Sequence, residues 1–80
     1  MGRVHTVGRV VIWVYGREHL PPHFHITSPD TEALVEIATF DLYAGELPRG
    51  ATGRRAMEWA RANVDQIIAE WNRMNPRWPI

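Results

Sequence analysis

Residues 23–37, with the sequence HFHITSPDTEALVEI, carry the pattern that decides the fold. The first five of them alternate polar and apolar side chains, which is the period of a half-buried β-strand. Residues 28–31, SPDT, have the composition of a turn. Residues 32–37, EALVEI, alternate again. The stretch therefore predicts an antiparallel hairpin with one apolar face and one polar face.

The register of this hairpin decides which polar side chains meet. If Phe24 lies opposite Val35, then His23 lies opposite Glu36. A slip by two residues keeps the apolar face together and places His25 opposite Glu36 instead, whereas a slip by one would bury charges. In either allowed register, His23, His25 and Glu36 share one face of the sheet.

Apolar segments on both sides of the hairpin predict the rest of the sheet. Residues 10–15, VVIWVY, are β-branched and aromatic and predict a strand that is buried on both faces. Residues 4–8 either begin this strand or form a short strand of their own. Residues 42–47 predict a short fourth strand, which Pro48 closes.

After the sheet, the apolar period changes to the period of a helix. Thr52 is the predicted N-cap, and Pro76 ends the predicted helix after Asn75. The length is about 22 residues, with one apolar stripe along the helix. Its members follow a spacing of 3, 4, 3, 4 and 3: Met57, Ala60, Val64, Ile67, Trp71 and Met74.

Together these elements predict a single α+β domain over residues 1–80. A small antiparallel β-meander of three to four strands, about residues 4–48, packs on one long C-terminal helix, about residues 52–75. Residues 76–80 form a short Pro-rich tail.

Composition excludes several classes of site and location. The chain has no Cys, so it has no disulfide, no thiolate zinc site and no thiol nucleophile. Its longest apolar run, residues 10–15, is far shorter than the roughly 20 residues of a bilayer span, and no secretory signal is visible. We therefore expect a cytoplasmic protein with no membrane partner.

The formal net charge of zero hides an asymmetry along the chain. Residues 1–48 hold three Arg, six acidic residues and all four His, for a net charge of −3. Residues 49–80 hold six Arg and three acidic residues, for a net charge of +3. These halves either attract each other within one fold, or the Arg-rich half binds RNA or an acidic partner. A partner chain, a second copy included, would add stability to so small a domain.

The His cluster is the main chemical signal. His19, His23 and His25 occur within seven residues, and Glu36 shares the face of the last two. They could bind a metal ion such as zinc, which takes imidazole and carboxylate ligands. They could instead perform metal-free acid–base chemistry on a phosphodiester. A structural role, in which they hydrogen-bond each other and anchor the turn, is the third interpretation.

Residues 14–25, VYGREHLPPHFH, strongly resemble the signature of a small bacterial family, domain of unknown function 4160. Residues 45–48, GELP, and the tail at 75–80, NPRWPI, are similar to further motifs of that family. The resemblance extends over residues 8–80. It departs at Phe40–Asp41, where we expect a Gly in the turn.

Members of that family are often encoded beside a second small protein, in pairs that resemble toxin–antitoxin modules. The resemblance therefore implies that this chain is one component, the toxin-like one, of a two-protein bacterial module, with the cognate small protein as its partner. Our leading hypothesis is a ribonuclease site formed by His19, His23 and His25, with Glu36 or Tyr15 assisting.

In this hypothesis, Arg54 and Arg55 near the start of the helix would bind the phosphate charge of RNA. Two alternatives stay open. One is a protein-interaction module without catalysis. The other is a metal-binding domain in which His19, His23 and His25 are the ligands.

Overall fold

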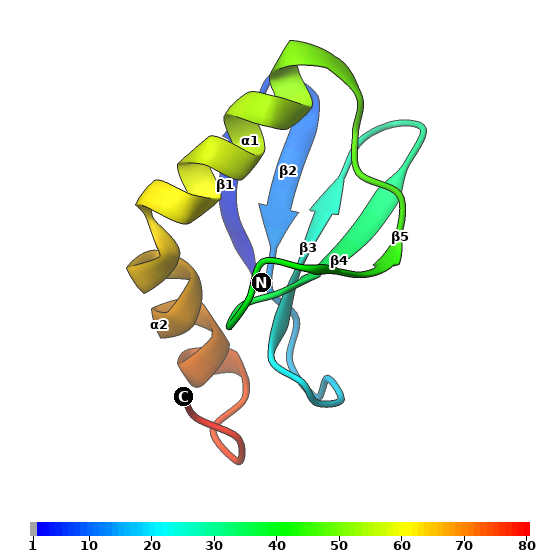
Figure 1. The fold of residues 1–80 in the computed structure, drawn as a ribbon. Coiled ribbons are helices and arrows are strands. Elements are labelled where there is room, and N and C mark those ends of the chain that lie inside the picture. Colours follow the sequence, from blue (N-terminus) through cyan, green and yellow to red (C-terminus); the bar gives the residue numbers. More distant parts are fainter. Residues whose placement is uncertain (1) are drawn as a thin grey trace.

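The structure, a computed structural model, describes residues 2–80. Its sheet has five strands: β1 (Arg3–Val7), β2 (Val10–Trp13), β3 (His23–Thr27), β4 (Glu32–Glu36) and β5 (Leu42–Gly45). Two helices follow: α1 (Gly50–Ala62) and α2 (Val64–Met74). Each strand pairs antiparallel with the next one in sequence, so the sheet is a meander (Figure 1). The α+β class is confirmed, with five strands and two helices in place of the three to four strands and one helix expected.

The central hairpin takes the first of the two predicted registers. Phe24 pairs with Val35, and His23 pairs with Glu36. His25 pairs with Leu34, which is two residues away from the Glu36 predicted by the slipped register. The apolar side chains of β3 and β4 thus meet on one face, and the His side chains lie on the other.

The prediction of a strand over residues 10–15 buried on both faces is wrong. β2 ends at Trp13, and its burial alternates, with Val10 and Ile12 buried and Val11 and Trp13 half-buried. The reason is that helices cover only one face of this sheet, so β2 needs only one apolar face. The segment before it forms a strand of its own, β1, as one of the two predictions for residues 4–8 allowed.

The predicted single helix is broken at Asn63. The backbone N–H and the side-chain Nδ2 of Asn63 both donate to the Trp59 carbonyl, each at 2.9 Å. The Asn63 carbonyl then accepts the Gln66 N–H at 3.0 Å and begins α2. Asn competes for backbone hydrogen bonds in this way and so favours helix ends. The first helix also begins at Gly50, with Arg49 as its N-cap, rather than at Thr52.

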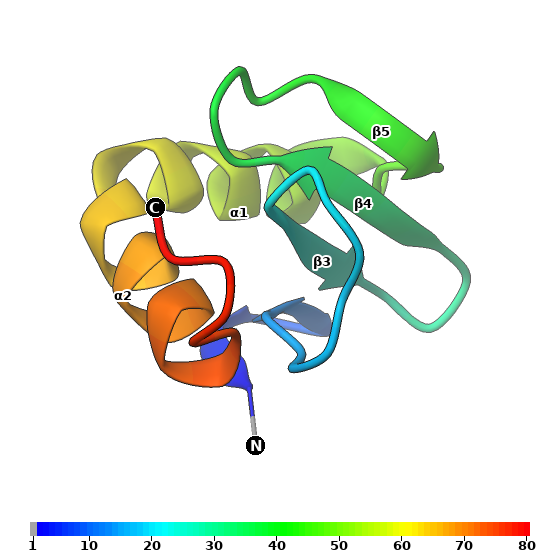
Figure 2. The same cartoon turned by 90° about the horizontal axis from the view of Figure 1, so that it is seen from below.

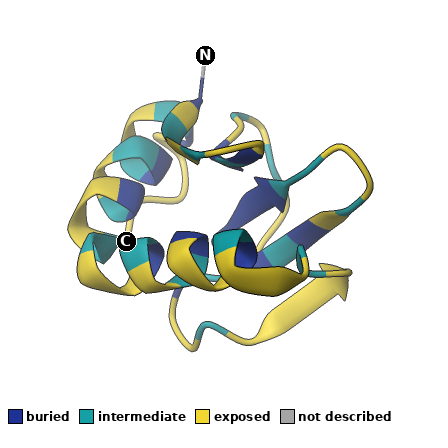
Figure 3. Cartoon of the chain, turned by 90° about the horizontal axis from the view of Figure 1, so that it is seen from above, coloured by how far each residue is buried: buried dark blue, intermediate teal, exposed yellow. Residues whose placement is uncertain are grey.

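The core lies between the sheet and the helices. α1 packs on β1 and β2, and α2 packs on β1 and β3, so both helices cover the same face (Figure 2). The buried side of each helix points toward the sheet (Figure 3). The buried apolar residues are Val10, Ile12, Val14, Phe24, Ile26, Ala33, Val35, Ile37, Ala56, Ala60, Ile67 and Trp71.

The turn between β4 and β5 explains the missing Gly. Phe40 has a φ of 62°, a left-handed conformation that costs a non-Gly residue about 1–2 kcal/mol. Its ring centroid lies 5.5 Å from that of Phe24, and the Arg61 guanidinium lies 5.5 Å from its ring centroid. These ring contacts offset the backbone cost, so a Phe replaces the expected Gly.

Neither helix in residues 2–80 combines the length and apolar character that crossing a bilayer requires.

Candidate functional site

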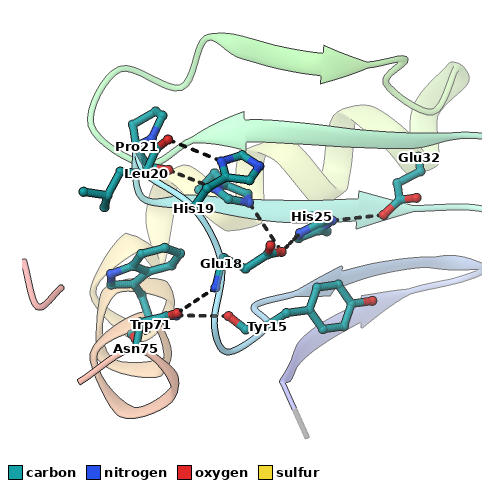
Figure 4. Close-up of polar contacts among 10 residues, drawn as sticks. Tyr15, Glu18, His19, Leu20, Pro21, His25, Glu32, Trp71 and Asn75 are labelled. Carbon is teal, nitrogen blue, oxygen red and sulfur yellow. Dashed lines mark hydrogen bonds and ion pairs between the residues drawn. The ribbon is translucent and has the colours of Figure 1, made fainter. Parts of the chain in front are cut away.

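His25 lies between two carboxylates on the sheet face opposite the core. Its Nε2 is 2.6 Å from Glu18 Oε1, and its Nδ1 is 3.0 Å from Glu32 Oε2 (Figure 4). An ionised carboxylate can only accept hydrogen bonds, so each ring nitrogen of His25 that carries a hydrogen donates it to the carboxylate beside it. Glu18 comes from the loop after β2, and Glu32 is the first residue of β4.

His23 is buried, and only one of its nitrogens is satisfied. Its Nδ1 donates to the Pro21 carbonyl at 2.8 Å, which leaves Nε2 to face the cluster. Nε2 is the one buried side-chain polar atom of residues 2–80 without a hydrogen-bond partner. Glu18 Oε1 lies 3.5 Å from it, close enough for charge interaction but not aligned as a hydrogen bond. A buried unpaired nitrogen costs free energy and needs an explanation.

Aromatic rings enclose His23 and keep water out. Ring centroids lie 5.1 Å away for His19, 5.8 Å for Trp71 and 6.1 Å for Tyr43. The His23 side chain is 0% exposed as a result. A dry, low-dielectric wall of this kind strengthens electrostatic contacts inside the cluster.

Glu18 is held in place by the end of α2. Its backbone N–H donates to Asn75 Oδ1 at 3.3 Å, and Asn75 Nδ2 donates to the Tyr15 carbonyl at 3.0 Å. Asn75 is 3% exposed. One buried amide therefore fixes both ends of the loop segment that carries Glu18 (Figure 4).

The three side chains form a possible ligand set. Glu18, His23 and His25 each offer one ligand atom, and these atoms lie within 4.8 Å of one another. Ligand atoms around one tetrahedral zinc ion lie about 3.4 Å apart, so the groups would have to move by about an ångström. Both His residues also use Nδ1 for a carbonyl or carboxylate, which is the arrangement that orients metal-binding imidazoles.

Two further residues predicted for the site, His19 and Tyr15, contact the cluster through their rings. His19 is exposed and stacks on His23, and its Nδ1 is 3.3 Å from the Leu20 carbonyl. Tyr15 meets the His25 ring edge-on, with centroids 4.5 Å apart. Burial raises the pKa of the Tyr15 phenol, and the charges of Glu32 and Glu18 raise it further.

Glu36 and the two Arg residues lie outside the cluster. Glu36 pairs with His23 across the strands, but within residues 2–80 no hydrogen bond or ion pair joins its carboxylate to a His. Arg54 and Arg55 are exposed on α1. The first turns of α1 lie at the far end of the sheet from the loop that carries Glu18, so these Arg residues do not face the His cluster (Figure 1).

Two acidic residues of the site were missed in the sequence. Glu18 directly precedes His19, but it reaches the cluster only because its loop folds back over the sheet. Glu32 pairs with Thr27, and it shares a face with His25 by strand alternation. Strand alternation could therefore have identified Glu32 from the sequence. No spacing in the sequence could have identified Glu18, because it lies in a loop.

The fold and the site define a class: a small α+β domain whose sheet carries a buried His–Glu cluster beside a loop tied to the last helix. The chain belongs to the family described as Domain of unknown function (DUF4160), whose model matches residues 9–72. The family resemblance of the sequence is thereby confirmed. Comparisons with curated proteins and with solved structures give no match.

Proposed function

We propose that this domain binds a divalent transition metal ion, zinc by preference, through Glu18, His23 and His25. The observation that carries the proposal is the buried, unpartnered Nε2 of His23, which faces a carboxylate that also contacts His25. A metal ion would give this nitrogen a partner and would separate the Glu18 and His25 atoms that now lie 2.6 Å apart.

The donor set favours zinc over magnesium or calcium. Two imidazole nitrogens suit zinc and its neighbours in the first transition series, whereas magnesium and calcium prefer oxygen ligands alone. Three protein ligands leave one coordination position for water or another ligand, as in catalytic zinc sites. The proposed ligand set differs from the predicted one, because Glu18 takes the place of His19.

A metal-free ribonuclease has weaker support. An acid–base His must reach the phosphodiester, yet the His23 side chain is 0% exposed and that of His25 is 10% exposed. Both nitrogens of His25 already contact carboxylates. Ribonuclease activity therefore stays a prediction that depends on the metal, which can supply an activated water.

Zinc titration by calorimetry tests the proposal, with protein purified without an affinity tag. We expect one zinc per chain, binding that survives excess magnesium, and affinity at least about 100-fold weaker in Glu18→Gln and His25→Ala. His5→Ala is the matched control, because its side chain lies outside the three-residue group and stacks on Trp59 instead, and it should change affinity less than about twofold. Wild-type protein that takes up no zinc, or Glu18→Gln protein with unchanged affinity, would refute it.

A protein-interaction role is the second candidate, and one observation favours it. β5 is an edge strand, and all four of its residues are exposed, Leu42 and Tyr43 among them. Edge strands with apolar side chains pair readily with another chain. The predicted partner is the cognate small protein of a two-protein module. Co-purification of the two proteins tests this role, and it should fail when Tyr43 is changed to Lys or Leu42 to Pro.

A further inference from the structure

A hollow of about 530 Å³ lies beside the proposed metal centre. Arg17 and Glu18 line one side of it, and residues 74–78 at the end of α2 line the other. Its volume lies within the range of about 300–1,000 Å³ that small-molecule sites occupy. Glu18 belongs both to this hollow and to the His cluster, so a ligand bound here would adjoin the metal ligands.

The hollow is cationic because its two Arg side chains have no acidic partner. Within residues 2–80, neither Arg17 nor Arg77 forms an ion pair or a hydrogen bond through its guanidinium. The only acidic lining residue is Glu18, whose Oε1 contacts His25. Two free guanidinium groups on one hollow are suited to a phosphate, which Arg binds in a bidentate manner.

A second hollow of the same size shows that two Arg residues alone do not make a hollow cationic. It also measures about 530 Å³ and also holds two Arg residues, Arg9 and Arg49. There, however, Asp30 and Glu46 line the same wall, and Glu46 lies 3.7 Å from Arg49. The second hollow therefore has two positive and two negative side chains, whereas the hollow beside Glu18 has two positive side chains and one negative.

Trp78 adds an aromatic surface to the cationic hollow. It is 51% exposed, although its backbone is fixed at two points. Its carbonyl accepts the Trp71 Nε1–H at 2.7 Å, and its N–H donates to the Asn75 carbonyl at 3.0 Å. A large aromatic side chain held at the surface next to Arg residues is the arrangement on which nucleic-acid bases stack.

Arg17 is also held in an unfavourable backbone conformation. Its φ is 59°, in the left-handed region that Gly adopts more readily than Arg. Retention of a strained residue at a site is a reason to look for a role of its side chain. A Gly at this position would adopt the same φ without strain, so it would remove the guanidinium while the loop conformation is kept.

We infer that this hollow binds a nucleotide, with its phosphate between Arg17 and Arg77 and its base on Trp78. The nucleotide could be free or could be the terminal nucleotide of an RNA, since both present the same phosphate, ribose and base. This inference names a ligand class for the metal centre and, in its coupling to zinc, rests on the proposed function. Zinc would neutralise the Glu18 carboxylate that otherwise repels the phosphate, so zinc and nucleotide should strengthen each other's binding.

Calorimetric titration with AMP tests the inference, first on protein treated with a chelator and then on zinc-loaded protein. We expect binding to metal-free protein that weakens about tenfold or more in the double variant Arg17→Gly/Arg77→Ala. The matched control, Arg9→Ala/Arg49→Ala, removes the same charge from the balanced hollow and should change affinity less than about twofold. Trp78→Ala should weaken AMP binding more than inorganic phosphate binding, because only AMP has a base to stack.

The outcomes separate this inference from the proposed metal centre. AMP binding that is absent from wild-type protein, or equal in both double variants, overturns the inference even if zinc binds. AMP binding that depends on Arg17 and Arg77 sustains it even if zinc does not bind, and only the coupling is then lost. Short RNAs with and without a terminal phosphate distinguish the two sources, since preference for the phosphorylated RNA over AMP would assign the site to RNA ends.

Discussion

The two faces of the sheet use the same strands for opposite purposes. The face under the helices is lined by apolar side chains such as Ile12, Phe24 and Val35, each less than 2% exposed. The opposite face carries His23 and His25, which are also buried but are held by polar contacts and aromatic rings. Burial alone therefore does not distinguish the two faces. The unsatisfied polar atom does, because among residues 2–80 the one buried side-chain polar atom without a hydrogen-bond partner, His23 Nε2, lies on the His face.

The largest expected effect is on the helix-covered face. Phe24→Ala should lower the free energy of unfolding by about 3–5 kcal/mol, because Phe24 is fully buried and its removal leaves a cavity. In a domain of 80 residues, such a loss approaches the whole stability. Urea denaturation followed by circular dichroism measures it. Leu42→Ala, at an exposed position, should cost less than about 1 kcal/mol, and equal losses would contradict the contrast between buried and exposed apolar residues.

His23→Phe should abolish stabilisation by zinc while it changes the stability of the metal-free fold little. The substitution removes the unpartnered Nε2 but also the Nδ1 hydrogen bond to the Pro21 carbonyl, and because these effects oppose each other the stability of metal-free protein should change by less than about 2 kcal/mol. Zinc at about 100 times its dissociation constant should stabilise the wild type by about 2.7 kcal/mol. In a domain of this size, that raises the melting temperature by roughly 10–20 °C. Thermal scans should find this increase absent in His23→Phe, and an equal increase in both proteins would mean that zinc binds elsewhere.

Glu32→Gln should have a smaller effect, confined to the His face. The Glu32 carboxylate holds His25 Nδ1 at 3.0 Å, and loss of its charge should weaken zinc binding about tenfold. Glu36→Gln is the matched control on the same strand, because within residues 2–80 the Glu36 carboxylate forms no hydrogen bond or ion pair with a His ring. Competition with a zinc-sensitive dye measures both affinities. If zinc affinity falls more in Glu36→Gln than in Glu32→Gln, then Glu36 rather than Glu32 belongs to the site, as the sequence had predicted.

The smallest expected effect concerns Tyr15. Burial, Glu32 and Glu18 raise the pKa of its phenol above the ordinary value. The neutral phenol is therefore favoured by folding. The resulting stability is complete below the ordinary pKa and is lost as the pH rises through the raised pKa of the folded protein. Ultraviolet titration in a Tyr43→Phe background should detect this raised pKa, and Glu32→Gln should lower it. An unchanged pKa in that variant would exclude Glu32 as a cause.

The parts of the fold that repeat along the chain could be predicted from the sequence. Strand alternation allowed two registers that keep the apolar face together, and the structure takes the one with Phe24 opposite Val35 and His23 opposite Glu36. The break at Asn63 could not be predicted in the same way. The apolar spacing continues across it, because α2 stays on the same side of the sheet as α1.

The candidate site could be predicted only where it lies on strands. His23 and His25 follow the alternation of β3, and Glu32 follows that of β4. Glu18 lies in a loop, where no period relates sequence to direction, and its position depends on a hydrogen bond to a residue 57 positions away. The hollow lined by Arg17 and Arg77 has the same origin, because it forms where that loop meets the end of α2.

The two hydrogen bonds that the Asn75 side chain makes with the loop of Glu18 determine when the site can form. Asn75 joins Tyr15 and Glu18 across 60 and 57 residues, so these contacts span most of the chain. Contacts between such distant residues form late, after local hairpins and helices. During synthesis, β3, which carries both His23 and His25, has been made well before Asn75. The growing chain therefore cannot fix Glu18 against its histidines before Asn75 has been synthesised, and the proposed metal site cannot form until then.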